Sequence, residues 1–167
     1  VHVLFESAVI AEYLDEISGN PALPAEPLAR ARIRAWIEYA SASLADMARL
    51  YSASDGVGFD AAVSAIEEWL EKIERGIRGP FFGGTRFGLA DAAFAPLFRY
   101  LDVFERELGF TLVERPPKVA AWARELAARP SVIGAVPLDY ADRLLAFAVA
   151  KDAQLARVLR DRILEAA

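Results

Sequence analysis

The chain lacks cysteine entirely, and it contains one histidine and one methionine among its 167 residues. The absence of cysteine excludes disulfide bonds, thiolate metal sites and a cysteine nucleophile within this chain. The solitary histidine, His2, has no second imidazole to share a metal ion, so it is interpreted as an ordinary surface residue. No metal site is therefore predicted.

Long hydrophobic runs and basic clusters are also missing. The longest uninterrupted apolar run, residues 144–150, is far shorter than the roughly 20 residues that a membrane span requires. The opening residues do not resemble an export signal, so none is expected. The formal net charge is -5, which argues against nucleic acid as a partner. With 167 residues, 55% of them hydrophobic, we expect a soluble globular protein with one well-filled core, or one domain with a fragment of another.

What the sequence does contain is apolar residues at helical spacing along almost its whole length. The opening residues 1–5 are β-branched and aromatic, and they suit a short strand. After this strand the pattern predicts only helices, and these cover residues 7–17, 27–51, 59–78, 88–108 and 117–128, followed by a brief helical turn and one or two helices within 140–164. The predicted fold class is therefore mainly α.

An acid and a small hydroxyl, Glu6 and Ser7, stand at the start of the first predicted helix, in the stretch "FESAVIAEYLDE". A serine at this position commonly caps the helix by accepting a backbone N–H, which stabilises it by about 1 kcal/mol. The same geometry offers N–H groups and a hydroxyl to a small carboxylate, while Glu6 offers a partner to an ammonium. An α-amino acid head group carries both charges, so the residues themselves leave a cap and a binding site open.

The stretch "LFESAVIAEYLDE" resembles the end of the thioredoxin-like half of glutathione transferases, where the matching run holds the γ-glutamyl head of glutathione. The resemblance continues through "ARARIRAWIEY", "FFGGTRFGLADAAFAPLF" and "KVAAWARELAARPSV", in the family's order, and covers most of residues 3–133. It implies that Glu6 and Ser7 bind glutathione. It also implies a remnant of the thioredoxin-like domain over residues 1–20, a short βα unit, and an all-α C-terminal domain over 21–167.

The resemblance further implies a function. Family members conjugate the glutathione thiolate to a small hydrophobic electrophile, or run a related glutathione-dependent reaction, as cytoplasmic homodimers that need no metal. In the family, the residue that activates the thiol and the strand with the cis-proline precede the matched part. No catalytic residue is therefore assigned, and the chain as given is expected to be inactive or nearly so. The alternative is a non-catalytic helical module of the same family that binds other proteins.

Two further sets of residues carry predictions. Asp91 stands at the third position of the helix expected after Gly88, where an acid reaches back to the backbone N–H of the cap residue, so it is predicted to be a structural helix cap. On the helix over 27–51, Tyr39, Ser43 and Met47 share one face at spacings of four. They are predicted to border a pocket for the second substrate, with packing inside the bundle as the alternative.

Overall fold

The structure is a computed structural model that describes the backbone of residues 2–19 and 21–165 and the side chains of residues 2–19 and 21–161. Within these ranges the chain forms helices joined by loops, and no strand is present. The helices are α1 (Ser7–Ile17), α2 (Pro27–Ser52), α3 (Gly56–Glu74), α4 (Leu89–Leu108), α5 (Pro117–Ala128), α6 (Pro130–Ile133), α7 (Tyr140–Val149) and α8 (Gln154–Glu165). The predicted mainly α fold is confirmed.

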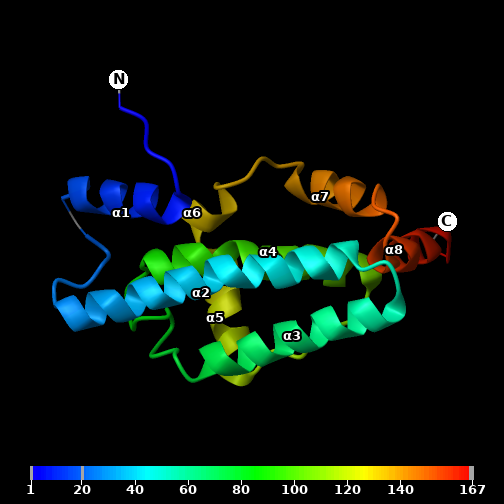
Figure 1. The fold of residues 1–167 in the computed structure, drawn as a ribbon, viewed down its shortest axis with the longest axis horizontal. Helices are drawn as coiled ribbons and strands as arrows, with labels where there is room; N and C mark the ends of the chain where they lie inside the picture. Colours follow the sequence, from blue (N-terminus) through cyan, green and yellow to red (C-terminus); the bar gives the residue numbers. More distant parts are fainter. Residues whose placement is uncertain (1, 20, 166–167) are drawn as a thin grey trace.

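Three long helices make the body of the molecule. α2 and α4 run side by side, α3 returns along α2 in the opposite direction, and α5 crosses beneath them (Figure 1). α2 begins at Pro27, whose missing N–H costs nothing in the first turn. The carboxylate of Glu26 accepts the N–H groups of Leu28 and Ala29 at 2.8 and 2.6 Å, which satisfies two donors of that turn.

Aromatic side chains fill the centre between α4, α5 and the loop before α4. The indole of Trp122 lies 5.2, 5.3 and 5.4 Å from the rings of Phe98, Phe94 and Phe82, as measured between centroids. Each of these four side chains is at most 2% exposed. Aromatic pairs at such distances add to the free energy gained from burial, so this cluster is the main anchor of the bundle.

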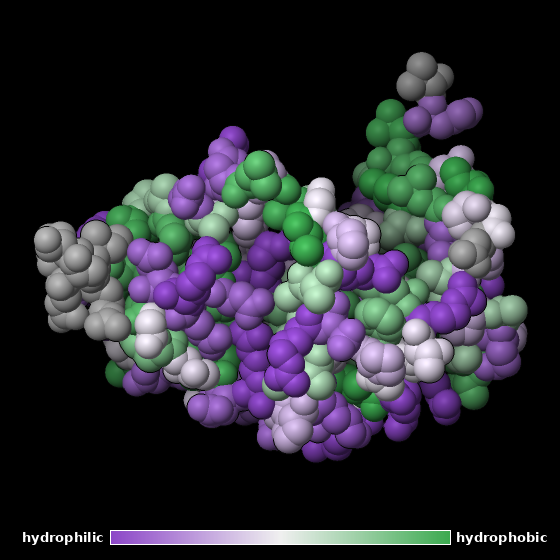
Figure 2. Space-filling view, turned by 180° about the vertical axis from the view of Figure 1, so that it is seen from behind, coloured by the Kyte–Doolittle hydropathy of each residue, from purple (hydrophilic) through white to green (hydrophobic). Residues whose placement is uncertain are grey.

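The predicted strand at the N-terminus was wrong for the described residues 2–5, which are not part of any sheet. A strand is stable only beside another strand, and the described residues supply none. The side chains of Val3 and Phe5 are 81% and 77% exposed as a result. In the space-filling view this segment projects from the body of the molecule and carries apolar surface (Figure 2).

The bounds of α3 also differ from the prediction. The helix begins at Gly56 because the side chain of Asp55 caps it by accepting the Gly58 N–H at 2.8 Å. It ends at Glu74, before the predicted end at Arg78, and a tight loop follows. In this loop the N–H of Arg78 donates to the carbonyl of Phe82 at 3.1 Å. The sequence pattern located the helix, and capping chemistry set its start.

α1 lies over one end of α2 and α4 and makes few contacts with them, while α7 and α8 cover the opposite end (Figure 1). Among the described residues, two polar attachments hold α1. The buried carboxylate of Asp15 accepts the N–H groups of Ala22 and Leu23 at 2.6 and 3.1 Å, which ties α1 to the segment leading into α2. On the surface, Arg34 of α2 donates to the carboxylate of Glu12.

Candidate functional site

The N-terminus of α1 has an unusual backbone. Glu6 precedes the first helical residue with φ 68° and ψ 115°, and it is the one non-glycine residue with positive φ in the described part of the chain. Such a conformation costs about 1–3 kcal/mol for an ordinary residue and is found preferentially at functional sites. The carbonyl of Glu6 accepts the N–H of Ile10 at 3.0 Å, so the strained residue starts the helix directly.

Ser7 is the first helical residue and therefore does not occupy the cap position, which Glu6 takes. The interpretation of Ser7 as a helix cap was wrong for this reason. No side chain of the described residues caps α1, so its first-turn N–H groups lack a side-chain acceptor. The side chains of Glu6 and Ser7 are both exposed. The helix start thus presents N–H groups, a hydroxyl and a carboxylate to solvent.

A cavity of about 520 Å³ opens beside this helix start, between α1, α2 and α4. Glu6 and Ser7 line it from α1, and Glu38 and Ser41 line it from α2. Its apolar walls include Val9, Ile37, Leu44, Leu89 and Pro96. A cavity of this volume, mostly apolar with a few polar groups, is typical of sites for small molecules.

Sequence reasoning missed the α2 side of this cavity. Ile37, Ser41 and Leu44 are spaced by four and three residues, so they share one helix face, and that face lines the cavity. In the sequence, the small Ser41 between two apolar residues of this helix could have indicated the face that lines a cavity. This pattern did not identify the cavity, because helical spacing does not give the position of α1 relative to α2.

The structure does not bring Tyr39, Ser43 and Met47 to this cavity. Met47 and Ser43 are 1% and 3% exposed, and the hydroxyl of Ser43 donates to the carbonyl of Tyr39 at 2.9 Å. Tyr39 is half-buried, with the Nζ of Lys72 3.9 Å from its ring centroid. Tyr39 therefore contacts α3, while Ser43 and Met47 are packed inside the bundle, as in the packing alternative stated above.

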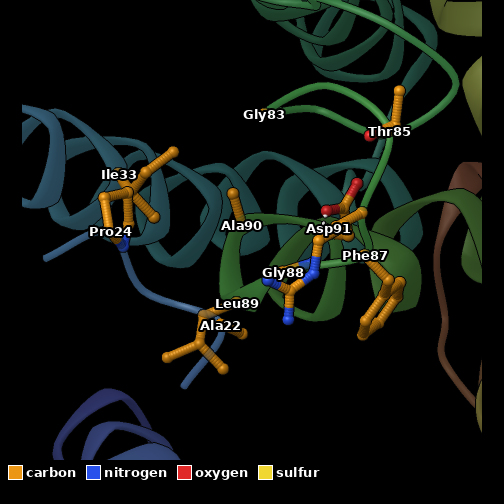
Figure 3. A pocket seen from close by; sticks show the side chains of 11 residues that line it. Ala22, Pro24, Ile33, Gly83, Thr85, Phe87, Gly88, Leu89, Ala90 and Asp91 are labelled. Carbon is orange, nitrogen blue, oxygen red and sulfur yellow. Dashed lines mark hydrogen bonds between the residues drawn. The ribbon is translucent and has the colours of Figure 1, made fainter. Parts of the chain in front are cut away.

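Asp91 lies at the third position of α4 and is 1% exposed. Its Oδ2 accepts the N–H of Gly88 at 2.8 Å, while Oδ1 accepts the N–H of Phe82 at 2.8 Å and the indole N–H of Trp122 at 2.6 Å. Figure 3 shows Asp91 and Gly88 on one wall of a neighbouring pocket of about 230 Å³. One carboxylate thus joins the start of α4, the preceding loop and α5.

Burial raises the pKa of the Asp91 carboxyl, and the hydrogen bonds from Phe82, Gly88 and Trp122 oppose that rise. The Asp91 carboxylate accepts hydrogen bonds from three donors inside the protein. Its surroundings are those of a structural acceptor, because the side chain does not reach the cavity that Glu6 and Ser7 line.

The described residues contain no group of three or more histidine, aspartate or glutamate side chains arranged to hold a metal ion. His2 is exposed, at the end of the projecting segment. None of the helices within the described ranges has the length and apolar character needed to cross a bilayer.

Comparison with known proteins shows that this chain matches one family. Residues 30–125 match the family described as "Glutathione S-transferase, C-terminal domain". Glutathione transferase GST 23 from Zea mays is 33% identical over 156 residues, which cover 90% of this chain and 69% of that relative. The chain belongs to the glutathione S-transferase family.

Solved structures give the same result. A Tau class glutathione S-transferase from mango, Mangifera indica L., superposes with a TM-score of 0.73 at 30% identity, covering 87% of this chain and 70% of that one. Rice GST1, solved in complex with glutathione, gives a TM-score of 0.73 at 30% identity, covering 87% of this chain and 68% of that one. The chain spans about 62% of the length of several curated relatives that it matches.

Proposed function

We propose that this chain contributes the γ-glutamyl end of a glutathione site. The observation that carries the proposal is the uncapped, strained start of α1, where Glu6 and Ser7 meet an apolar cavity. The γ-glutamyl head carries a carboxylate and an ammonium on one carbon. The first-turn N–H groups and the Ser7 hydroxyl bind the carboxylate, helped by the positive end of the helix dipole. The Glu6 carboxylate binds the ammonium.

The cavity wall formed by Ile37, Leu44 and Pro96 takes the second substrate, a small hydrophobic electrophile. In the proposed reaction the glutathione thiolate attacks that electrophile, and the protein lowers the pKa of the thiol to make the thiolate available. The residues at the α1 site bind and orient the peptide. We propose that they do not activate its sulfur.

Family membership also supports a homodimer in the cytoplasm as the working state. Sedimentation equilibrium of the purified chain tests the first part of this proposal, because a dimer has twice the mass of the 18.3 kDa chain. Fluorescence microscopy of a tagged chain in cells tests the second part.

Calorimetric titration with reduced glutathione tests the site. We expect Ser7→Ala to weaken binding about fivefold, because one hydrogen bond to a charged group is lost. Ser41→Ala removes a hydroxyl from the opposite wall of the same cavity and serves as the matched control, with binding unchanged. Glutaryl-Cys-Gly, which lacks the ammonium, should bind wild type more weakly than glutathione, and Glu6→Gln should remove that preference.

Equal binding of glutathione by wild type, S7A and S41A would refute the assignment of Ser7. No binding of glutathione at millimolar concentration, together with tight capture of another protein, would favour the non-catalytic interaction module instead.

A further inference from the structure

Glu38 adds a second carboxylate to the cavity between α1, α2 and α4. It stands on α2, three residues before Ser41, so the two polar side chains are neighbours on the helix surface. Ile37 and Leu44 line the same cavity from α2. The wall that α2 contributes is therefore apolar, with one carboxylate and one hydroxyl set into it.

The Glu38 carboxylate is exposed and is available to a ligand. Among the described residues, no hydrogen bond or ion pair engages its side chain. The basic residue one turn earlier on α2 is Arg34, and its guanidinium donates to Glu12 of α1 instead. Glu38 thus faces the cavity with its charge unpaired.

The charged side chains that line this cavity all have one sign. Among the described residues that form its walls there are two acids, Glu6 and Glu38, and no lysine, arginine or histidine. Two carboxylates beside apolar walls give a concave site a negative potential, which attracts cations and repels anions. The proposed function assigns Glu6 to the ammonium of glutathione, so the Glu38 carboxylate is left for the second substrate.

We infer that Glu38 determines which electrophiles the cavity accepts, and that it favours those with a cationic or N–H donor group beside their apolar body. This inference rests on the proposed function, because it assigns the substrate class of the same site. The apolar body packs on Ile37, Leu44 and Pro96, and the ammonium, amidinium or amide group donates to Glu38. Glu38 binds and orients the electrophile and takes no part in bond formation.

The same arrangement disfavours electrophiles that carry a carboxylate or a sulfonate. Such a group meets the Glu38 charge and finds no basic side chain among the described residues of the cavity wall. Because Glu38 is exposed, water and salt screen its charge, so the selectivity is expected to be moderate.

Glutathione adducts that differ only in one para substituent test the inference by calorimetric titration. The ligands are S-(4-methylbenzyl)glutathione, S-(4-aminomethylbenzyl)glutathione and S-(4-carboxybenzyl)glutathione, which end in a neutral, a cationic and an anionic group. All three carry the same peptide, so differences in affinity report on the cavity wall. We expect the cationic adduct to bind about fivefold more tightly than the neutral one, and the anionic adduct about fivefold more weakly. Raised salt should reduce both differences.

Two substitutions at Glu38 and one matched control separate local charge from net charge. Glu38→Gln should bring the three affinities within about twofold of one another, and Glu38→Lys should reverse their order. Glu67→Gln makes the same charge change on an exposed residue of α3 that does not line the cavity, so it should keep the wild-type order. Glu38→Gln should also keep the preference for glutathione over glutaryl-Cys-Gly, since that preference is assigned to Glu6.

Four results would overturn the inference. Equal affinities of wild type for the three adducts would show that Glu38 does not select the electrophile, while binding of the neutral adduct would leave the proposed function intact. Equal loss of the order in E38Q and E67Q would reduce the effect to net charge. Loss of the preference over glutaryl-Cys-Gly in E38Q would place Glu38 at the ammonium of the peptide. If no adduct binds at millimolar concentration, the proposed glutathione site fails, and this inference fails with it.

Discussion

α1 and the bundle formed by α2–α5 both carry apolar residues at helical spacing, but the two regions bury them very differently. In α1, Val9 and Ile17 are 53% and 60% exposed, whereas Ile66 and Leu70 of α3 are fully buried. The bundle is stabilised by its own packing. α1 is held mainly by Asp15 and a surface ion pair, and it presents its open N-terminus to a cavity. The comparison separates a stable scaffold from the element that bears the proposed site.

The largest difference in the free energy of unfolding is expected when an isoleucine is replaced by alanine, once in the bundle and once in α1. Ile66→Ala should lower the free energy of unfolding by about 4 kcal/mol, because it removes a fully buried side chain and leaves a cavity. Ile17→Ala, in α1, should lower it by less than about 0.5 kcal/mol. Urea denaturation followed by circular dichroism measures both. Equal losses would show that α1 is packed as firmly as the bundle.

The next largest effect is expected at Asp91. Asp91→Ala leaves three internal N–H donors without their acceptor and should lower the free energy of unfolding by about 3 kcal/mol. Asp91→Asn keeps an oxygen acceptor and should cost less. A loss below about 1 kcal/mol for D91A, measured by the same denaturation, would contradict the structural role.

The raised pKa of Asp91 also predicts that the stability of the chain depends on pH. Because burial raises its pKa in the folded chain, the folded state holds the proton more tightly than the unfolded state. Its contribution to stability is therefore complete below the unfolded pKa and is lost as the pH rises through the folded pKa. The stability of wild type relative to D91N should fall as the pH rises above about 4, the ordinary pKa of an unfolded aspartate. A rise of this stability with pH would mean that the hydrogen bonds outweigh burial.

Much of this scaffold could be predicted from the sequence, since the spacing of apolar residues located the long helices and the acid after Gly88 indicated a capped helix. Other features depend on contacts between distant residues. The strand predicted over residues 1–5 needed a neighbour that the described residues do not supply. The face of α2 that lines the cavity became identifiable only once α1 lay beside it. Helical spacing indicates that a face is buried, but it does not indicate which partner buries it.

A smaller loss of stability is expected at Gly76, where two aromatic rings lie close to the backbone. Gly76→Ala should lower the free energy of unfolding by about 2 kcal/mol, because the added methyl overlaps the rings of Phe82 and Trp36. Gly56→Ala is the matched control, since a Cβ at that position meets nothing within 4 Å. It should be neutral or slightly stabilising. Thermal unfolding of both variants tests this prediction. Equal changes in the unfolding midpoint would contradict the close packing at Gly76.

The smallest effects concern the attachments of α1. Asp15→Ala should cost about 1.5 kcal/mol, because the N–H groups of Ala22 and Leu23 lose a buried acceptor. Arg34→Ala breaks an exposed ion pair and should cost less than Asp15→Ala, because water and salt screen the pair. Denaturation monitored at several salt concentrations distinguishes the two. A larger cost for R34A than for D15A would reverse the assigned order of the attachments.

Amide hydrogen exchange of the chain with and without reduced glutathione tests the central claim most directly, because it reports on both regions in one experiment. The account predicts fast exchange in α1 without ligand and slow exchange in the core of α4. Saturating glutathione should then slow exchange at Ser7–Ile10 and leave α4 unchanged. Unchanged exchange at Ser7–Ile10 under saturating glutathione would contradict the assignment of the site to the start of α1.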